Sequence, residues 1–93
     1  MPDDGTGRVE VVLLTQPNCG FCDQAKAALG RVADDFELRI SEIELASLEG
    51  EELALRNGVM FPPGILLDGR LFSYGRLSER KLRRELGKRN GRA

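Results

Sequence analysis

Hydrophobic positions in the first half of the chain predict a strand, a helix and a second strand. Residues 8–14, "RVEVVLL", form a nearly continuous apolar run, which is typical of a strand buried on both faces. Residues 36–43, "FELRISEI", alternate between apolar and polar, which indicates a half-exposed strand at a sheet edge. Between them, apolar side chains recur at the spacing of one helical face: Ala25, Ala28, Leu29 and Val32.

The second half predicts a helix, a hairpin and a closing helix. Residues 46–58 predict a weaker helix, whose apolar positions are Leu48, Leu53 and Leu55. The "NG" at its end is typical of a helix that stops at a residue in the left-handed conformation. The segment "GILLDGRLFSY" predicts two short strands joined at "DG", the strongest hairpin signal in the chain. Residues 77–89 place Leu82 and Leu86 on one helical face, with Ser78 as the N-cap.

The predicted order is therefore β-α-β-α-β-β-α. It indicates an α/β fold with a four-stranded mixed sheet flanked by three helices, in which the first two strands are parallel. A chain of 93 residues can hold one modest core, so we expect a single domain over residues 1–93. We expect the ordered part to cover about residues 8–88, with the basic tail from Gly87 frayed.

Composition and charge exclude several classes of protein. The net charge of −1 gives no reason to expect a nucleic-acid or membrane partner. The start, "MPDDGTGR", is polar and has no apolar run of signal-peptide length, so we expect a soluble, cytoplasmic monomer. The sequence contains no histidine, which removes Cys–His catalysis and most transition-metal sites.

The two cysteines, Cys19 and Cys22, carry the strongest chemical signal. Residues at i and i+3 on a helix are about 5–6 Å apart, the Cα separation that a disulfide needs. The helix start stabilises an anion, which favours a thiolate at Cys19, whereas Cys22 lies one turn further in. We therefore expect Cys19 to attack a disulfide and Cys22 to resolve the mixed disulfide.

Other readings of the pair remain open. The cysteines could be two buried structural residues, or they could supply half of a zinc site shared between chains; we expect no metal. Between them, Gly20 keeps side-chain bulk away from an incoming sulfur, and Phe21 is expected to be a partly exposed apolar contact for a partner.

Three motifs together resemble the thioredoxin superfamily, and most closely the glutaredoxins. They are "CGFC" after the first strand, "PPGILLDG" before the hairpin and "YGRLS" before the last helix, and the resemblance covers roughly residues 8–88. It implies a thioredoxin fold in its glutaredoxin-sized form and thiol–disulfide oxidoreductase activity. It also implies a cis-proline facing the cysteines, which the spacing to Asp68 and Gly69 assigns to Pro63.

The chain departs from the glutaredoxin pattern at the glutathione contacts. Pro62, before the expected cis-proline, has no N–H with which to pair a substrate backbone. Gln16 stands where many glutaredoxins have a lysine for the glycine carboxylate. The family's glycine pair before the last helix is half matched by Tyr74, Gly75 and Arg76, of which Arg76 could hold a carboxylate bidentately.

The expected function is reduction of protein or small-molecule disulfides by the CGFC dithiol, with no bound cofactor. The reductant is left open between glutathione, another low-molecular-weight thiol and a flavoprotein reductase. The alternatives are a [2Fe–2S] cluster carrier, because monothiol glutaredoxins carry "CGFS", and a thioredoxin-fold binding module without turnover.

Overall fold

The computed structural model describes residues 8–90 and contains the predicted order of elements. The structure does not describe residues 1–7 and 91–93. The expectation that the chain has no signal peptide rests partly on residues 1–7, so it lies outside the described residues. The elements are β1 (Val9–Thr15), α1 (Gly20–Val32), β2 (Leu38–Glu44), α2 (Leu48–Asn57), β3 (Gly64–Leu67), β4 (Arg70–Tyr74) and α3 (Glu79–Asn90). Each boundary lies within a few residues of the sequence pattern, so the predicted fold class is confirmed.

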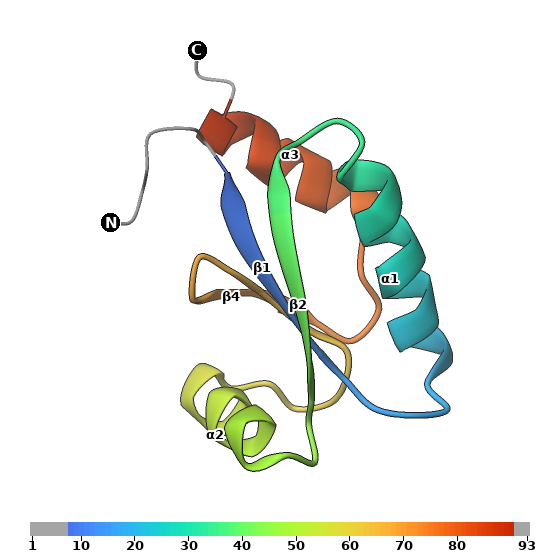
Figure 1. Ribbon diagram of the computed structural model, residues 1–93, viewed down its shortest axis with the longest axis vertical. Helices are drawn as coiled ribbons and strands as arrows, with labels where there is room; N and C mark the ends of the chain where they lie inside the picture. The colour runs from blue at the N-terminus through green and yellow to red at the C-terminus, as the bar shows by residue number, and fades with distance from the viewer. Residues whose placement is uncertain (1–7, 91–93) are drawn as a thin grey trace.

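The four strands form one mixed sheet in the order β2-β1-β3-β4. β1 pairs in parallel with β2 and antiparallel with β3, and β3 pairs antiparallel with β4. The predicted edge position of β2 is confirmed, and the central position of β1 explains its apolar run. Figure 1 shows α1 and α3 beside each other, whereas α2 lies apart from them at the other end of the molecule.

The main core lies between the sheet and the helix pair α1 and α3. The apolar face predicted for α1 is fully buried, and Leu82 and Leu86 of α3 are each 0% exposed, as the periodicity predicted. The sheet contributes alternate residues of β1 and β3, as a pleated strand with one core-facing side requires. The cluster comprises Val9, Val11, Leu13, Ala25, Leu29, Val32, Ile65, Leu67, Leu82 and Leu86.

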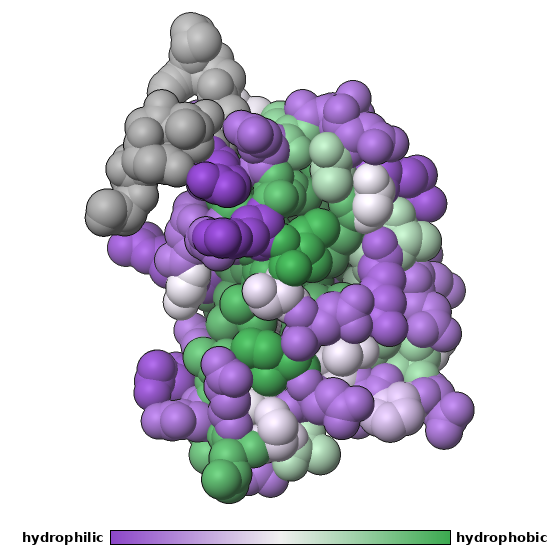
Figure 2. All heavy atoms as spheres, in the orientation of Figure 1, coloured by the Kyte–Doolittle hydropathy of each residue, from purple (hydrophilic) through white to green (hydrophobic). Residues whose placement is uncertain are grey.

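The second helix packs through a glycine and leaves two of its leucines in solvent. A Cβ atom at Gly50 would overlap the Glu44 carbonyl, so α2 approaches the end of β2 by its backbone. Leu48 and Leu55 are 87% and 85% exposed. Gly58, with φ of 73°, provides the predicted left-handed stop. Figure 2 shows hydrophobic side chains at the surface in the middle of the molecule and again at the end where α2 lies.

The Asp68 side chain adds to the strand pairing that holds the "DG" turn to the rest of the fold. Asp68 and Gly69 have φ values of 50° and 83°, the positive values that a tight two-residue hairpin requires. Asp68 accepts from the Glu10 backbone N–H at 2.9 Å and pairs with Arg89 at 3.1 Å. Arg89 is also bonded to Glu85, and α3 continues to Asn90, so residues 87–90 of the tail expected to be frayed are helical. The rest of that tail, residues 91–93, lies outside the described residues.

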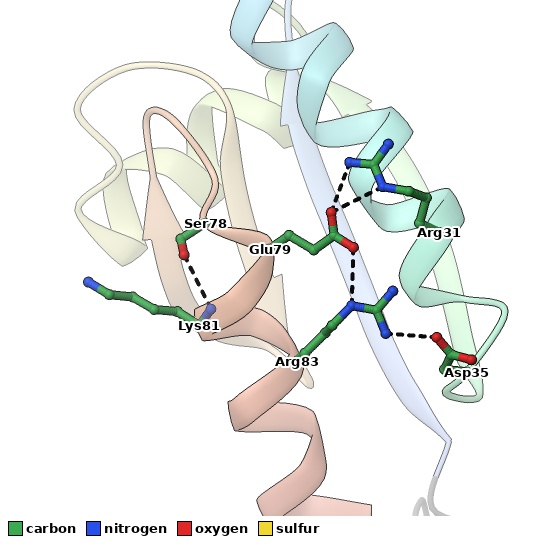
Figure 3. Close-up of polar contacts among 6 residues, drawn as sticks. All are labelled: Arg31, Asp35, Ser78, Glu79, Lys81 and Arg83. Carbon is green, nitrogen blue, oxygen red and sulfur yellow. Dashed lines mark hydrogen bonds and ion pairs between the residues drawn. The ribbon is translucent and has the colours of Figure 1, made fainter.

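An ion-pair network fastens α1 to α3 (Figure 3). Glu79, in the first turn of α3, accepts two hydrogen bonds from Arg31 of α1, at 3.1 and 2.8 Å, and one from Arg83 at 3.1 Å. Arg83 also bonds Asp35 at 2.7 Å. The hydrogen bonds from Arg31 and then Arg83 lower the pKa of Glu79, and those to Asp35 and then Glu79 raise the pKa of Arg83.

The network makes stability dependent on pH in a defined direction. Because the folded pKa of Glu79 lies below its ordinary value of 4.5, its contribution is complete above pH 4.5 and is lost as pH falls through the folded value. Glu79→Gln should therefore lower the melting temperature at pH 7, and the difference from the wild type should vanish in strong acid. Glu37→Gln, which changes an exposed carboxylate outside the network, is the control. If the melting temperatures of Glu79→Gln and the wild type still differ by the same amount below pH 3, Glu79 is not the source of the pH dependence.

Candidate active site

The pairing of the strands brings the segments that contain Cys19, Pro63 and Gly75 to the same end of the sheet. Leu14, near the end of β1, lies opposite Gly64 at the start of β3, and Gly64 lies opposite Tyr74 at the end of β4. The chain therefore leaves β1 towards Cys19 at the same end of the sheet where Pro63 leads into β3. The residues after β4, beginning with Gly75, start from this end too.

Cys19 is the N-cap of α1. Its backbone is extended, with φ of −122° and ψ of 108°, and its Sγ accepts a hydrogen bond from the Cys22 backbone N–H at 3.1 Å. Its carbonyl oxygen accepts from the Asp23 N–H at 3.1 Å, which begins the helix. The sulfur thus occupies the place where a helix presents unpaired N–H groups and the positive end of its dipole.

The two cysteines are joined as a disulfide and are unequal in exposure. Their Cα atoms are 5.2 Å apart, inside the range that allows a bridge without moving the backbone. Cys22, in the first turn of α1, is 1% exposed, whereas Cys19 is only partly buried. A partner sulfur therefore meets Cys19 first. The predicted closeness of the pair is confirmed.

Pro63 has the conformation that the resemblance implied. The Pro62–Pro63 peptide bond is cis, and Pro63 is among the most deeply buried side chains. Its carbonyl oxygen accepts a hydrogen bond from the Gly75 N–H at 2.8 Å, which joins the segment before β3 to the turn after β4. Pro62 is partly buried and has no N–H to offer.

An exposed aromatic pair flanks this segment and was not anticipated from the sequence. The rings of Phe61 and Tyr74 meet edge to face at 5.1 Å, and they are 55% and 38% exposed. Gly75 makes the pair possible, because a Cβ at this position would lie 2.8 Å from the Phe61 ring. Phe21 and Met60, at 47% and 72%, are also exposed. The available signal was the run of apolar residues immediately before "PP", which no buried element uses.

The remaining predicted residues, Gln16, Gly20 and Arg76, are exposed. Gln16 is exposed in the turn before Cys19, and Gly20 opens α1 with free space where a side chain would stand. Arg76 is exposed and lines a surface depression of about 500 Å³ at the start of α3. The other lining residues are Leu77, Ser78, Glu79 and Lys81. The structure thus joins Pro63 to Gly75 and Cys19 to Cys22, while Gln16 and Arg76 are exposed to solvent.

Within residues 8–90 no group of three or more His, Cys, Asp or Glu side chains is placed to hold a metal ion. In the same part of the chain, no helix is both long and apolar enough to cross a membrane.

Residues 8–90 therefore combine a thioredoxin-type fold with a cysteine pair at the start of its first helix. Residues 10–87 match the model of the glutaredoxin-like domain family (DUF836), and the chain belongs to this family. It is similar in structure to a mutant thioredoxin from Halobacterium salinarum NRC-1, with a TM-score of 0.70 and 21% identity, over 88% of this chain and 74% of that one. At that identity the likeness concerns the fold alone.

A curated relative is similar over part of the chain. The NADPH-dependent thioredoxin reductase 3 of Arabidopsis thaliana is 36% identical over 56 residues, which is 60% of this chain. The aligned part spans only 11% of that protein's length.

Gly75 offers a test of how the aromatic pair is positioned. Its φ of 80° costs a residue with a Cβ roughly 1–2 kcal/mol, and Gly75→Ala should in addition displace Phe61. Gly69→Ala is the matched control, because φ is 83° there and its Cβ would meet nothing within 4 Å. We expect urea denaturation to show a larger loss in the free energy of unfolding in the Gly75 variant than in the Gly69 variant. Equal losses in the two variants would contradict the close approach of Phe61 to Gly75.

Proposed function

We propose that this protein is a thiol–disulfide oxidoreductase that reduces substrate disulfides through a mixed disulfide on Cys19. The observation that supports the proposal most directly is the inequality of the two cysteines. The Cys19 sulfur caps α1 and is reachable, whereas Cys22 is 1% exposed behind it. A sulfur in the first position is stabilised as a thiolate, and the thiolate is the nucleophile in disulfide exchange.

The reaction needs two exchange steps and moves two electrons. In the first, the Cys19 thiolate attacks one sulfur of the substrate disulfide, that S–S bond breaks, and the departing thiolate takes a proton from solvent. In the second, Cys22 loses its proton and attacks the Cys19 sulfur. The mixed disulfide breaks, the second substrate sulfur leaves as a thiol, and the protein holds the Cys19–Cys22 disulfide. An external thiol or a flavoprotein reductase returns the two electrons.

The surroundings favour protein disulfides over glutathione as substrates. Pro62 leaves only its carbonyl oxygen to pair with a substrate backbone, so one of the two bridging hydrogen bonds is lost. The exposed rings of Phe61 and Tyr74 offer apolar surface to the residues beside a substrate cysteine. Glutathione is small and polar and gains little from that surface. We place the activity in the cytoplasm, where a cysteine pair is kept reduced and available.

The assignment of the two cysteines can be tested by substitution and labelling. Cys19→Ser should abolish reduction of a generic disulfide, because the remaining thiol, Cys22, is only 1% exposed and cannot reach a substrate disulfide. Cys22→Ser should keep the first step and accumulate a mixed disulfide on Cys19, visible as a mass increase in intact-protein spectrometry. In the reduced wild type near pH 6, iodoacetamide should label Cys19 before Cys22. Faster labelling of Cys22 would show that the roles are reversed.

The substrate preference has its own test. Reduction of a peptide disulfide flanked by leucine or phenylalanine should have a several-fold higher kcat/KM than reduction of glutathione disulfide at equal reductant. Phe61→Ala should erase most of this advantage, because it removes half of the exposed aromatic pair. Leu55→Ala, which removes an even more exposed apolar side chain from α2, should leave the ratio unchanged. A wild-type preference for glutathione disulfide would contradict the proposed substrate class.

A further inference from the structure

Cys22 is buried, yet it must become an anion during the reaction. It is 1% exposed, and in the second exchange step it has to lose its proton before it can attack the Cys19 sulfur. Burial disfavours a thiolate, and Cys22 lies one turn beyond the helix start at which the Cys19 sulfur is stabilised. The sequence has no histidine that could act as a base. The resolving step therefore needs another source of stabilisation for the Cys22 anion.

Lys26 is the cation nearest to Cys22 along α1. The two residues are four apart, which places them on one side of the helix with Cβ atoms about 5–6 Å apart. Side chains of an α-helix point back towards its N-terminus, so the stem of Lys26 lies over the turn that contains Cys22. The other cation of α1, Arg31, is in its last turn and is bonded to Glu79 at 2.8 Å. Lys26 is thus the cation of α1 whose charge can act on Cys22.

An ion pair holds the Lys26 ammonium between α1 and β2, which lie side by side (Figure 1). Its Nζ atom is 3.5 Å from Oε1 of Glu42. Glu42 lies opposite Leu13 in the parallel pairing of β2 with β1, two residues before the end of β1. The pair therefore belongs to the end of the sheet from which the chain leads to Cys19. With the Lys26 side chain 44% exposed, its charge is partly screened by water.

The other charged groups on the elements around Cys22 are mainly acidic. The segment 59–64, which contains Pro63, has no charged residue, and the turn after β4 has Arg76, which is exposed. The exposed carboxylates of α1 and β2 at this end are Asp23, Glu42 and Glu44. Carboxylates oppose a further anion at Cys22, whereas the Lys26 ammonium favours it.

We propose that Lys26 stabilises the thiolate of Cys22 and so promotes release of the substrate from Cys19, while Glu42 positions Lys26; this inference rests on the proposed function. In this step the Cys22 proton passes to solvent, the Cys22 thiolate attacks the Cys19 sulfur, and the mixed disulfide breaks. The departing substrate thiolate takes up a proton, so no further reactant is consumed. Lys26 exchanges neither protons nor electrons and acts only through its charge.

Two substitutions separate the effect of charge from that of a link between α1 and β2. Lys26→Gln and Glu42→Gln both break the ion pair, but the first removes a positive and the second a negative charge. The amide in Glu42→Gln can still accept a hydrogen bond from the ammonium, so Lys26 keeps its place. Lys26→Arg keeps the charge. The control is Lys88→Gln, which removes an exposed lysine of α3 that is likewise paired with a glutamate, Glu85, at 3.9 Å.

The resolving step can be followed by rapid mixing of reduced protein with one equivalent of the aromatic disulfide DTNB. One aromatic thiolate is released when Cys19 is modified, and a second when Cys22 resolves the adduct. Near neutral pH the second phase should be about threefold slower in Lys26→Gln and faster in Glu42→Gln, because a unit charge about 6 Å away in a mainly aqueous setting changes a thiolate population about threefold. It should be unchanged in Lys26→Arg and Lys88→Gln. The first phase should not differ between Lys26→Gln and Lys88→Gln.

A second measurement needs no turnover. In the Cys19→Ser background Cys22 is the only thiol of the chain, and its ionisation is followed by ultraviolet absorbance. The midpoint of this titration should rise by about half a pH unit with Lys26→Gln, fall with Glu42→Gln, and stay in place with Lys26→Arg. The differences should shrink in 1 M salt, where the Debye length is about 3 Å.

The direction of the two shifts decides between the explanations. Shifts of the same sign in Lys26→Gln and Glu42→Gln would mean that the ion pair is only a structural link, and no shift in either would mean that its charges do not act on Cys22; both results overturn the proposal. Opposite shifts without release of the second thiolate would instead reject the resolving role of Cys22 and leave the effect of Lys26 on its thiolate standing. A second phase that occurs normally but is insensitive to Lys26→Gln would reject the role of Lys26 alone.

Discussion

The hydrogen bond from the Cys22 backbone N–H to the Cys19 sulfur is the contact on which the site depends. It makes one atom both the cap of α1 and the reactive group, so the helix cannot begin here without placing that sulfur at its positive end. A hydrogen bond to a thiolate is stronger than one to a thiol, so ionisation of Cys19 also strengthens the cap. The start of the helix and the reactivity of the cysteine are therefore stabilised by the same interaction.

The sheet determines what that sulfur faces. Since β1 is central and pairs with both β2 and β3, its carboxyl end is fixed on two sides. The register that opposes Leu14 to Gly64 and Gly64 to Tyr74 brings the segment containing Pro63 and the turn at Gly75 to the same end. The Gly75 N–H then joins these two segments through the Pro63 carbonyl. Pro63 and Gly75, which are 44 and 56 positions after Cys19 in the sequence, are thereby positioned by strand pairing and one further hydrogen bond.

The features that could be predicted from the sequence are those with local causes. The helical face of α1, the turn at Asp68 and Gly69, the stop at Gly58 and the cap at Ser78 each follow from a few adjacent residues. The Phe61–Tyr74 pair could not be predicted in this way, because it depends on strand register and on the missing side chain at Gly75. The sequence pattern also did not predict that Leu48 and Leu55 are exposed, since Gly50 determines which side of α2 approaches the sheet.

The distribution of surface charge shows most clearly what could not be predicted from the sequence. The net charge of −1 suggested a surface without a strong field, but net charge is a sum and carries no position. Folding brings Arg31 and Asp35 of the α1 region against α3, where they engage Glu79 and Arg83. Those contacts hold the acidic groups on the inner side of α3 and leave cations on its outer side. The interactions that fasten α1 to α3 thus also create the charge asymmetry of the surface. A carboxylate that is paired on one side of a helix cannot neutralise the cations on its other side.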